Sequence, residues 1–464
     1  MSRWMPKIDH RKGPRYLAIA DAIGEAIRDG SLQPEQRLPT HRDLAYDLGV
    51  TVGTVSRAYA EAVRRDYVVG EVGRGTYVKP DGEKRIPFYI PYDIDPNVFD
   101  FGLNFPAEGE RVNLLRSSLM TLAQDPGLGA LMRYQSEQGM LHHRQSMATW
   151  ASQHGTPNDP DRIVISNGVQ HAMTLSLMAQ ARAGDTLLCE EYTYPGIKGL
   201  ATQLGLKLQG VPMDEKGLIP EKLEDMVIQT GSRILYCMPN YQNPTSVIMP
   251  LDRRKEIADI AQRYGLWIIE DDIYGFLNDN LHDTIPFAQM LPEQTYYLNG
   301  SSKCVSPGLR IGFVLAPERK VKTVAACVRL SSWMAAPLNA EIISRWVEDG
   351  TAYQQMEWHR EEASRRREIV LKYLGDQDIM STDHTYHCWL KLASPWTADT
   401  FVMRARERDV SIIPASTFHV GRGAPINAVR ICYGAPPSIE NVEEGMKRLG
   451  QLIHEEIHAF ESVM

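Results

Sequence analysis

The chain has 464 residues, of which 43% are hydrophobic and 23% are charged, and its formal net charge is −8. At about 100–200 residues per domain, this length corresponds to about two to four domains. The composition is that of a globular protein and excludes a disordered, collagen-like or coiled-coil chain. We find no apolar run near the roughly 18–20 residues that a membrane span needs. We therefore predict several folded domains and no membrane segment.

The charge is unevenly distributed along the chain. Residues 1–80 contain 13 Lys+Arg and 10 Asp+Glu, a balance of +3, and the other 384 residues contain 37 and 48, a balance of −11. Because a partner meets the local charge and not the average, the acidic total does not exclude nucleic-acid binding by the first segment. A balance of +3 is only mildly basic, so the residue pattern must decide.

Three helices are predicted in this first segment. Apolar residues recur at helical spacing over residues 16–29. A second helix is expected after Thr40, with Asp43 completing an approximate capping box, and Gly49 ends it. Thr51 can then cap a third helix. Two helices joined by so short a turn form a helix-turn-helix, whose second helix can enter the major groove of DNA.

A β-hairpin is predicted directly after the third helix. Residues 67–78 are typical of two short strands around a glycine-rich turn, with Arg74 at the tip. Three helices followed by such a hairpin make a winged helix, so we predict a winged helix-turn-helix DNA-binding domain over residues 1–80. Residues 81–100 are rich in proline and lack periodicity, and we expect them to form a linker.

The first segment resembles the GntR family of winged-helix regulators. The residues that carry the resemblance lie at 30–45, 48–50, 54–55, 58–59 and 73–76. The resemblance implies contacts with DNA for Arg37, Thr40, Arg42, Thr51, Thr54, Arg57 and Arg74. The family usually has Ser-Arg where this chain has Thr51-Val52, so one expected arginine contact is absent. Taken singly, each arginine could equally be a solvated surface residue.

The rest of the chain alternates short apolar strands with helices. Strands are predicted near residues 163–165, 186–189, 234–238, 266–270, 296–298 and 311–315. Helical patterns run from the first strand to about residue 183 and occur near 253–264 and 318–345. This alternation predicts a mostly parallel α/β sheet with a ligand site at the carboxyl ends of its strands. A helix over 353–374 opens a smaller α+β subdomain at roughly 345–464.

Polar side chains that suit an aldehyde cofactor follow several of these strands. Lys303 lies among small residues after one strand and could form a Schiff base. Asp271 and Tyr274 follow a second strand, and Asn243 follows a third. Residues 166–170 open a helix whose N-terminal amides favour a phosphate. Each of these residues alone is more often structural, but their order along the chain favours one site.

Residues 101–464 resemble the fold-type I aminotransferases, which depend on pyridoxal 5'-phosphate (PLP). The resemblance implies that Lys303 forms the Schiff base and that Asp271 holds the pyridine nitrogen. It places Asn243 and Tyr274 at the 3-hydroxyl of the cofactor and Tyr194 against the face of its ring. The residues implied to surround the phosphate are Gly168, Val169, Gln170, Ser302 and Arg310.

The same resemblance assigns two residues beyond the cofactor. Arg430 matches the arginine that binds the carboxylate of a substrate or effector, and Tyr134 matches the tyrosine that reaches the phosphate of the partner subunit. Tyr134 therefore implies a homodimer. The chain departs from the family pattern at Gly300, where serine or threonine is usual, and at Ser246, where glycine is usual. His384-Thr-Tyr also replaces the usual glycine-rich lead into the strand of the small subdomain. These departures leave full transamination undecided.

The whole chain resembles the MocR subfamily of GntR regulators, in which a winged helix is fused to an aminotransferase-like domain. This implies a PLP-dependent transcriptional regulator that binds an operator with two half-sites as a head-to-tail homodimer. Our hypothesis is that an amino acid, another amine or PLP itself is sensed through the Lys303 aldimine. One alternative is a catalytically active aminotransferase with a fused DNA-binding domain. A weaker one is a DNA-binding protein that uses a cofactor-free fold only to dimerise.

The cysteines indicate the compartment. They are widely separated and form no Cys-x-x-Cys pair: Cys189, Cys237, Cys304, Cys327, Cys388 and Cys432. This spacing argues against a disulfide framework and a zinc site, so we predict no bound metal and a reducing cytoplasm. Residues 1–10 also lack the apolar core of a secretory signal.

Overall fold

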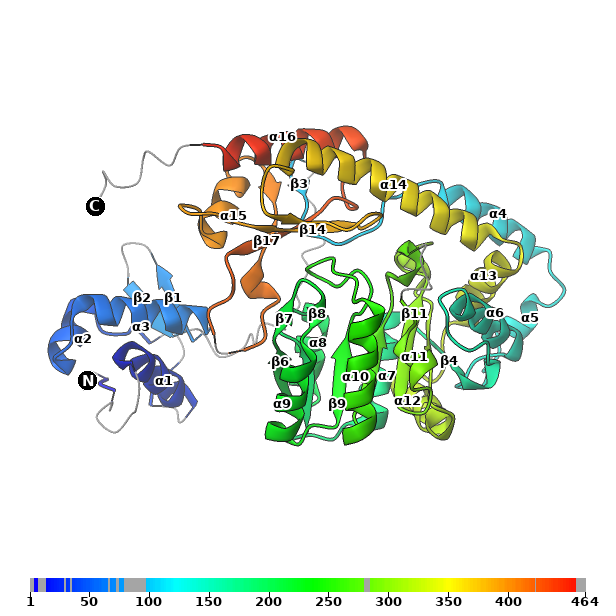
Figure 1. Cartoon of the computed structure of the whole chain (residues 1–464), viewed down its shortest axis with the longest axis horizontal. Helices are drawn as coiled ribbons and strands as arrows, with labels where there is room; N and C mark the ends of the chain where they lie inside the picture. The colour runs from blue at the N-terminus through cyan, green and yellow to red at the C-terminus, as the bar shows by residue number, and fades with distance from the viewer. Residues whose placement is uncertain are drawn as a thin grey trace. The chain divides into compact units, whose positions relative to one another are not determined.

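The computed structural model describes residues 4–6, 14–28, 31–33, 36–65, 67–71, 75–78, 97–278, 284–421 and 423–455. The chain divides into two compact units, Met1–Tyr89 and Ile90–Met464 (Figure 1). Among the described residues, no helix is long and apolar enough to cross a membrane.

The first unit is a winged helix, as predicted. Its elements are α1 (Arg15–Arg28), α2 (His41–Leu48), α3 (Val52–Arg64), β1 (Val68–Glu71) and β2 (Gly75–Val78), and the two strands pair antiparallel. Thr40 and Thr51 cap α2 and α3 by accepting hydrogen bonds from backbone N–H groups. Gly49 ends α2 in the left-handed conformation that glycine adopts most easily. Local capping therefore sets the predicted helix-turn-helix.

The second unit is built on a seven-stranded sheet in the order β4-β12-β11-β10-β9-β5-β6. The strands are β4 (Ile163–Ser166), β5 (Thr186–Glu190), β6 (Lys207–Val211), β9 (Ile234–Cys237), β10 (Trp267–Asp271), β11 (Thr295–Gly300) and β12 (Gly312–Leu315). Only β12 runs antiparallel to its neighbours, so the mostly parallel sheet is confirmed. The unpredicted strand is β6, an edge strand whose Lys207 and Gln209 are exposed and give no apolar run.

Helices cover both faces of this sheet. Neighbouring residues of β9 point to opposite faces. Tyr236 packs on one face with α7 (Val169–Gln180) and α12 (Val321–Ser332). Leu235 packs on the other face with α9 (Pro220–Thr230) and α10 (Leu251–Tyr264). The predicted helical stretch near 318–345 contains two helices, since Trp333 has φ 69° and Pro337 begins α13 (Pro337–Glu348). The other elements here are α4 (Arg111–Ala123), α5 (Leu128–Leu131), α6 (Leu141–Ser152), α8 (Pro195–Gln203), α11 (Phe287–Met290), β7 (Met213–Asp214) and β8 (Gly217–Leu218).

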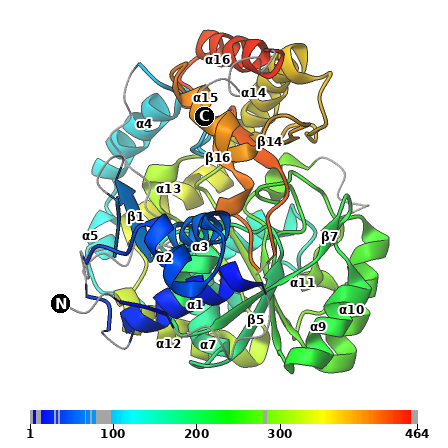
Figure 2. The same ribbon diagram turned by 90° about the vertical axis from the view of Figure 1, so that its left-hand side faces the viewer.

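A smaller antiparallel sheet, in the order β13-β14-β17-β16, forms a subdomain. Its elements are α14 (Thr351–Leu374), β13 (Ile379–Met380), β14 (His387–Lys391), α15 (Ala398–Arg406), β16 (Ile413–Pro414), β17 (Ala428–Cys432) and α16 (Ile439–Ile453). Helices α14 and α16 lie side by side on this sheet (Figure 2).

The predicted linker does not extend to residue 100. Strand β3 (Phe99–Asp100) pairs in parallel with β15 (Val410–Ser411), so this stretch belongs to the small subdomain. Phe101, directly after β3, is fully buried in the core of that subdomain. Residues 81–96 of the predicted linker lie outside the described residues.

Candidate functional site

The residues expected to contact DNA lie on the surface of the first unit. Arg37, Arg42 and Arg57 are exposed. The Arg57 guanidinium packs on α1, where it lies 5.5 Å from the ring centre of Tyr16. Arg37 lies beside the hairpin, where a Cβ on Gly75 would come within 2.9 Å of the arginine Nε. Three cationic side chains thus frame the helix-turn-helix and the wing.

The three threonines in that prediction have a structural role. The Thr40 hydroxyl accepts a hydrogen bond from the Asp43 N–H at 3.3 Å. The Thr51 hydroxyl accepts one from the Thr54 N–H at 3.2 Å, and the two hydroxyls lie 2.9 Å apart. Capping does not prevent an exposed hydroxyl from also meeting a phosphate. Arg74 lies outside the described residues.

Val52 is an additional candidate at this surface. It is the first residue of α3 and is 45% exposed. An apolar side chain at the start of a helix that enters the major groove can contact the methyl group of thymine. The sequence indicated only a missing arginine here, although an apolar side chain directly after the capping Thr51 was a usable signal.

In the second unit, Lys303 follows the carboxyl end of β11. Its Nζ donates a hydrogen bond to the Asn104 backbone oxygen and lies 5.8 and 5.9 Å from the ring centres of Phe105 and Tyr274. Burial lowers the pKa of Lys303 to about 8, and the positive charge of Arg430 acts in the same direction. A lowered pKa leaves more of the amine in its neutral, nucleophilic form.

Two adjacent carboxylates at the end of β10 differ in their partners. Asp271 accepts a hydrogen bond from the Tyr236 hydroxyl at 2.9 Å and senses the charge of Lys303. Asp272 accepts one from the Asn240 amide at 2.7 Å, inside a buried structural network. Burial raises the pKa of both carboxyl groups to about 6. Asp271 is therefore the carboxylate that is coupled to the lysine.

A cradle suited to a phosphate lies at the start of α7. Gly168 has φ 84° and ψ 169° and makes no side-chain cap, so the first N–H groups of α7 have no capping side chain. The Arg310 guanidinium lies over Gly168, where an added Cβ would come within 2.8 Å of the arginine Cζ. Arg310 also donates to the Ser302 hydroxyl at 3.0 Å. The next residue of α7, Val169, is buried.

The ring-stacking candidate is joined to this cradle. The Tyr194 hydroxyl donates a hydrogen bond to the Gln170 Oε1 at 3.2 Å. Gln170 lies in the first turn of α7, so a single bond connects Tyr194, at the start of α8, to the cradle.

The packing of β11 and β12 against α7 explains why residue 300 is glycine. A Cβ on Gly300 would lie 2.7 Å from the Ile311 carbonyl oxygen and 2.8 Å from the Gly312 Cα. A Cβ on Gly312 would lie 2.9 Å from the Val169 nitrogen. The backbones approach too closely for the hydroxyl residue that the family pattern has at this position.

Arg430, on β17, lies at the boundary between the two parts of the second unit. It donates to the Asn243 Oδ1 at 2.7 Å and to the Gly102 carbonyl oxygen at 2.6 Å. Its guanidinium also lies 4.6 Å from the ring centre of Phe418. Arg430 is buried. A cationic fork is thus held next to Asn243, one of the expected cofactor residues.

Ser246 and His384 retain the backbone shape of the glycines that they replace. Their φ angles are 63° and 62°, in the left-handed region. The Ser246 carbonyl oxygen accepts a hydrogen bond from the Thr382 hydroxyl at 2.6 Å. His384 Nδ1 lies 2.6 Å from the Ser364 hydroxyl. Both contacts come from other segments of the chain, 136 and 20 residues away.

Among the described residues, no hydrogen bond or ring contact joins Tyr134 to another of the predicted site residues. It is 80% exposed, and its ring lies 5.6 Å from that of Trp333, which is 53% exposed. Other exposed large apolar residues between positions 112 and 141 are Val112, Leu119, Met120, Met132 and Leu141, and exposed Leu330 precedes Trp333 by three residues.

Four residues around the lysine were not predicted from the sequence. Besides Tyr236, they are Asn104, Tyr386 and His387. The Tyr386 hydroxyl donates to the Lys303 carbonyl oxygen at 3.0 Å, and Asn104 Nδ2 lies 3.2 Å from His387 Nδ1. The buried Asn104 Oδ1 has no hydrogen-bond partner among the described residues. These side chains come from distant segments, and no local spacing indicates that they meet.

Two known families match the two units. Residues 15–78 match the family of bacterial regulatory proteins described as the gntR family. Residues 97–449 match the family described as aminotransferase class I and II.

Relatives that match over nearly the whole chain include two regulators. An uncharacterized HTH-type transcriptional regulator of Bacillus subtilis, YdeF, is 28% identical over 451 residues, covering 97% of this chain and 96% of that protein. Another from Escherichia coli, YdcR, is 27% identical over 475 residues, covering 96% of this chain and 100% of that protein.

Among solved structures, a kynurenine aminotransferase from Pyrococcus horikoshii, in complex with PMP, matches with a TM-score of 0.71. It is 22% identical and covers 78% of this chain and 92% of its own. This likeness shows that the second unit has the aminotransferase fold.

Proposed function

Because the chain belongs to the aminotransferase class I and II family and carries a gntR-type domain ahead of it, we propose that it is a PLP-dependent transcriptional regulator of the MocR type that senses a small amine. The DNA-binding winged helix is the reader of the operator. The observation that supports the sensing role is that a partly buried amine, an anion cradle and a buried arginine fork occur together in the second unit.

The cofactor is pyridoxal 5'-phosphate, and the residues present fit it. Lys303, Asp271, Asn243, Tyr274 and Tyr194 would hold its ring. The residues that would hold the phosphate are Gly168, Val169, Gln170, Ser302 and Arg310. The cofactor supplies an aldehyde that amines attack and a ring that withdraws electrons.

The protein's own part in sensing is to present Lys303 and Arg430 to a ligand. Lys303, with its pKa lowered to about 8 by burial, provides an amine that exchanges with an incoming one. Arg430 binds the acid group of the same ligand as a fork. Because Arg430 lies on β17 and bonds to Asn243 in the large sheet's part of the unit, a ligand on Arg430 changes the contact between the two parts.

Regulation requires that the ligand bind one conformation of the protein better than the other. A coupling of about 1–3 kcal/mol is typical, and it changes DNA affinity about 5–150-fold. The effector class that this site favours is an amine or an amino acid with one free carboxylate.

We also propose a head-to-tail homodimer in the cytoplasm that binds an operator with two half-sites. The exposed pair Tyr134 and Trp333 and the exposed apolar residues of α4, at Val112, Leu119 and Met120, support an interface. Two winged helices related by a two-fold axis suit an operator with two half-sites. Sedimentation of the full-length protein tests this, and a monomer at micromolar concentration contradicts it.

The sensing function is tested with the full-length protein and DNA from its own upstream region. Amines are titrated while DNA affinity is followed by fluorescence anisotropy and the cofactor by visible absorbance. Lys303→Ala should bind DNA but lose the response to amines. Lys322→Ala, at an exposed lysine on α12, is the control and should respond as the wild type does. A full response in Lys303→Ala would refute the proposal.

A second candidate function is turnover. Because Lys303, Asp271 and Arg430 are all retained, an amino acid could be converted to its keto acid at this site. Keto-acid formation from single amino acids, supplied with a second keto acid that accepts the amino group and measured with and without DNA, distinguishes the two functions. Multiple turnovers with no effect on DNA affinity would favour the enzyme.

A further inference from the structure

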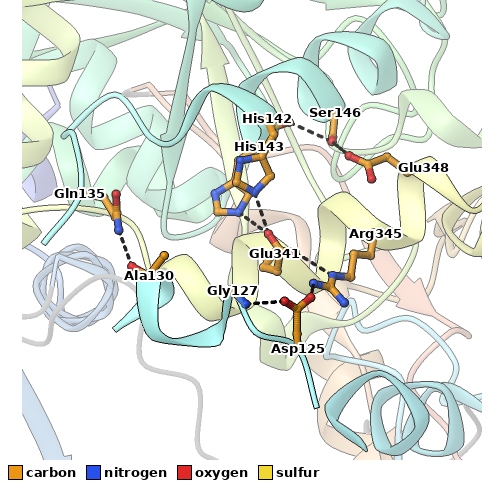
Figure 3. A network of polar contacts seen from close by, with 10 residues as sticks. All are labelled: Asp125, Gly127, Ala130, Gln135, His142, His143, Ser146, Glu341, Arg345 and Glu348. Carbon is orange, nitrogen blue, oxygen red and sulfur yellow. Dashed lines mark hydrogen bonds and ion pairs between the residues drawn. The ribbon is translucent and has the colours of Figure 1, made fainter. Parts of the chain in front are cut away.

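Two histidines and a glutamate, none of them among the residues assigned to the lysine site, form a cluster (Figure 3). His142 and His143 are on α6, and Glu341 is on α13. His142 Nε2 lies 2.7 Å and His143 Nε2 lies 3.0 Å from the same oxygen, Glu341 Oε2. Two imidazole nitrogens and one carboxylate oxygen therefore converge on one point, although they come from segments that are far apart in sequence.

These separations are near those of a metal site. In a tetrahedral Zn²⁺ site with bonds of about 2.0–2.1 Å, neighbouring donor atoms are about 3.3 Å apart. The two nitrogen–oxygen distances of 2.7 and 3.0 Å are only slightly shorter. The two imidazole rings, with centres 4.1 Å apart, already face the same carboxylate. All three donor atoms lie within 4.8 Å of one another, so an ion needs only a small adjustment of the three side chains.

The surroundings also suit a divalent cation. Arg345 Nε donates to the other oxygen of Glu341 at 2.7 Å and so leaves Oε2 for an ion, and Arg345 is itself paired with Asp125. Glu348, whose charge acts on His143, adds a third carboxylate. Three carboxylates and one guanidinium sum to −2, which a divalent ion neutralises. A ligating carboxylate that is held by a second group is usual in metal sites.

Access to the cluster is provided on one side. The side chain of His142 is 45% exposed, while those of His143 and Glu341 are 2% and 11% exposed. An ion can therefore enter from the His142 side and keep a water molecule as a fourth ligand. Two imidazoles and one carboxylate are a donor set that Zn²⁺ and Co²⁺ accept.

We propose that His142, His143 and Glu341 bind one Zn²⁺ or similar divalent transition-metal ion, which fastens α6 to α13. Through Arg345 and Asp125, the ion would also hold the turn at Gly127, whose N–H donates to Asp125 at 2.7 Å. This site has no sequence signature, because its donors come from neighbouring positions on one helix and from a helix almost 200 residues later. The cysteine spacing that predicted no metal does not bear on it.

The test uses full-length protein, free of any histidine tag and stripped of metal by a chelator. Because all six cysteines are buried, exposed thiols do not compete for the ion. Co²⁺ is titrated while its visible absorption is recorded, and Zn²⁺ binding is measured by calorimetry. We expect one equivalent to bind and to raise the unfolding temperature by mass action.

Variants decide whether the cluster is the site. His142→Gln removes the exposed ligand, and Glu341→Gln removes the charged one. Each should lower the affinity at least about tenfold. His454→Gln is the matched control, because His454 is also exposed and also faces one carboxylate, that of Asp376 at 3.3 Å.

Three outcomes would overturn the proposal. These are no saturable binding to the wild type, equal binding to His142→Gln and the wild type, or the same loss in His454→Gln. In the first case the cluster is a hydrogen-bonded network only. In the other two the ion binds elsewhere on the chain.

Discussion

Replacing Gly168 with alanine tests the phosphate cradle directly. Gly168 has φ 84° and ψ 169°, a region that is populated almost only by glycine. Holding another residue there costs of order 1–3 kcal/mol. The new Cβ would also meet the Arg310 guanidinium, 2.8 Å from Cζ. Since that group ends a flexible side chain, it moves away and no longer lies over the start of α7.

The expected loss of cofactor affinity follows from that displacement. A hydrogen bond to a charged group contributes about 1.5–3 kcal/mol, which corresponds to a change of about 10–150-fold in the dissociation constant. We therefore expect Gly168→Ala to bind PLP about 10–150-fold more weakly. The backbone strain at residue 168 has a different effect from the displacement of Arg310. It lowers the free energy of unfolding but does not change the charge of the cradle.

Gly184→Ala is the matched control. Gly184 also has a positive φ, 93°, but nothing lies within 4 Å of an added Cβ. Both variants should lose stability in urea unfolding. Only Gly168→Ala should lose PLP, measured by equilibrium titration of the apoprotein and followed by visible absorbance. Equal PLP affinity in the two variants would refute the role of Gly168 and Arg310 in holding the phosphate. This holds whether both variants bind PLP more weakly than the wild type or neither does.

Three further outcomes are expected. Arg57→Ala should weaken DNA binding similarly for all DNA sequences and reduce the slope of log affinity against log salt concentration by about 1. Fluorescence anisotropy at several salt concentrations measures this slope. An unchanged slope would show that Arg57 does not contact a phosphate. The rate at which the apoprotein binds PLP, measured by stopped-flow absorbance, should rise with pH and level off above about pH 8. The reason is that the neutral form of Lys303 is the nucleophile and its pKa is lowered to about 8. A rate that does not change from pH 6 to 9 would contradict this. Arg430→Lys should raise the dissociation constant of carboxylate-bearing amines about 10–100-fold and leave that of simple amines unchanged. The reason is that lysine keeps the positive charge but cannot donate two parallel hydrogen bonds to a carboxylate. Equal effects on both classes of amine would exclude a carboxylate contact.

Much of the fold could be predicted because its signals are local. Thr40, Gly49 and Thr51 set helix ends through bonds that span only a few residues. The buried strands of the large sheet appear as short apolar runs. The edge strand β6 was missed because an edge needs fewer apolar side chains, and residues 97–100 were missed because a two-residue strand has no periodicity.

The sequence indicates where the candidate site residues lie along the chain, but not what surrounds them. The positions of Lys303 and Asp271 follow strand ends that the sequence indicates. The residues around the lysine could not be predicted in this way, because Asn104 comes from an irregular stretch some 200 residues earlier. The same holds for the cluster at Glu341, whose parts meet only when two helices pack.

The bond between Arg430 and Asn243 has a practical consequence for finding ligands. The Asn243 amide oxygen accepts a hydrogen bond from Arg430. An acid that draws the guanidinium away therefore alters the hydrogen bonding of a group expected to touch the cofactor's hydroxyl. The absorption of the bound cofactor would then change even with a carboxylic acid that has no amine and cannot react. A collection of simple organic acids could therefore be screened by colour alone, without DNA and without knowing the operator.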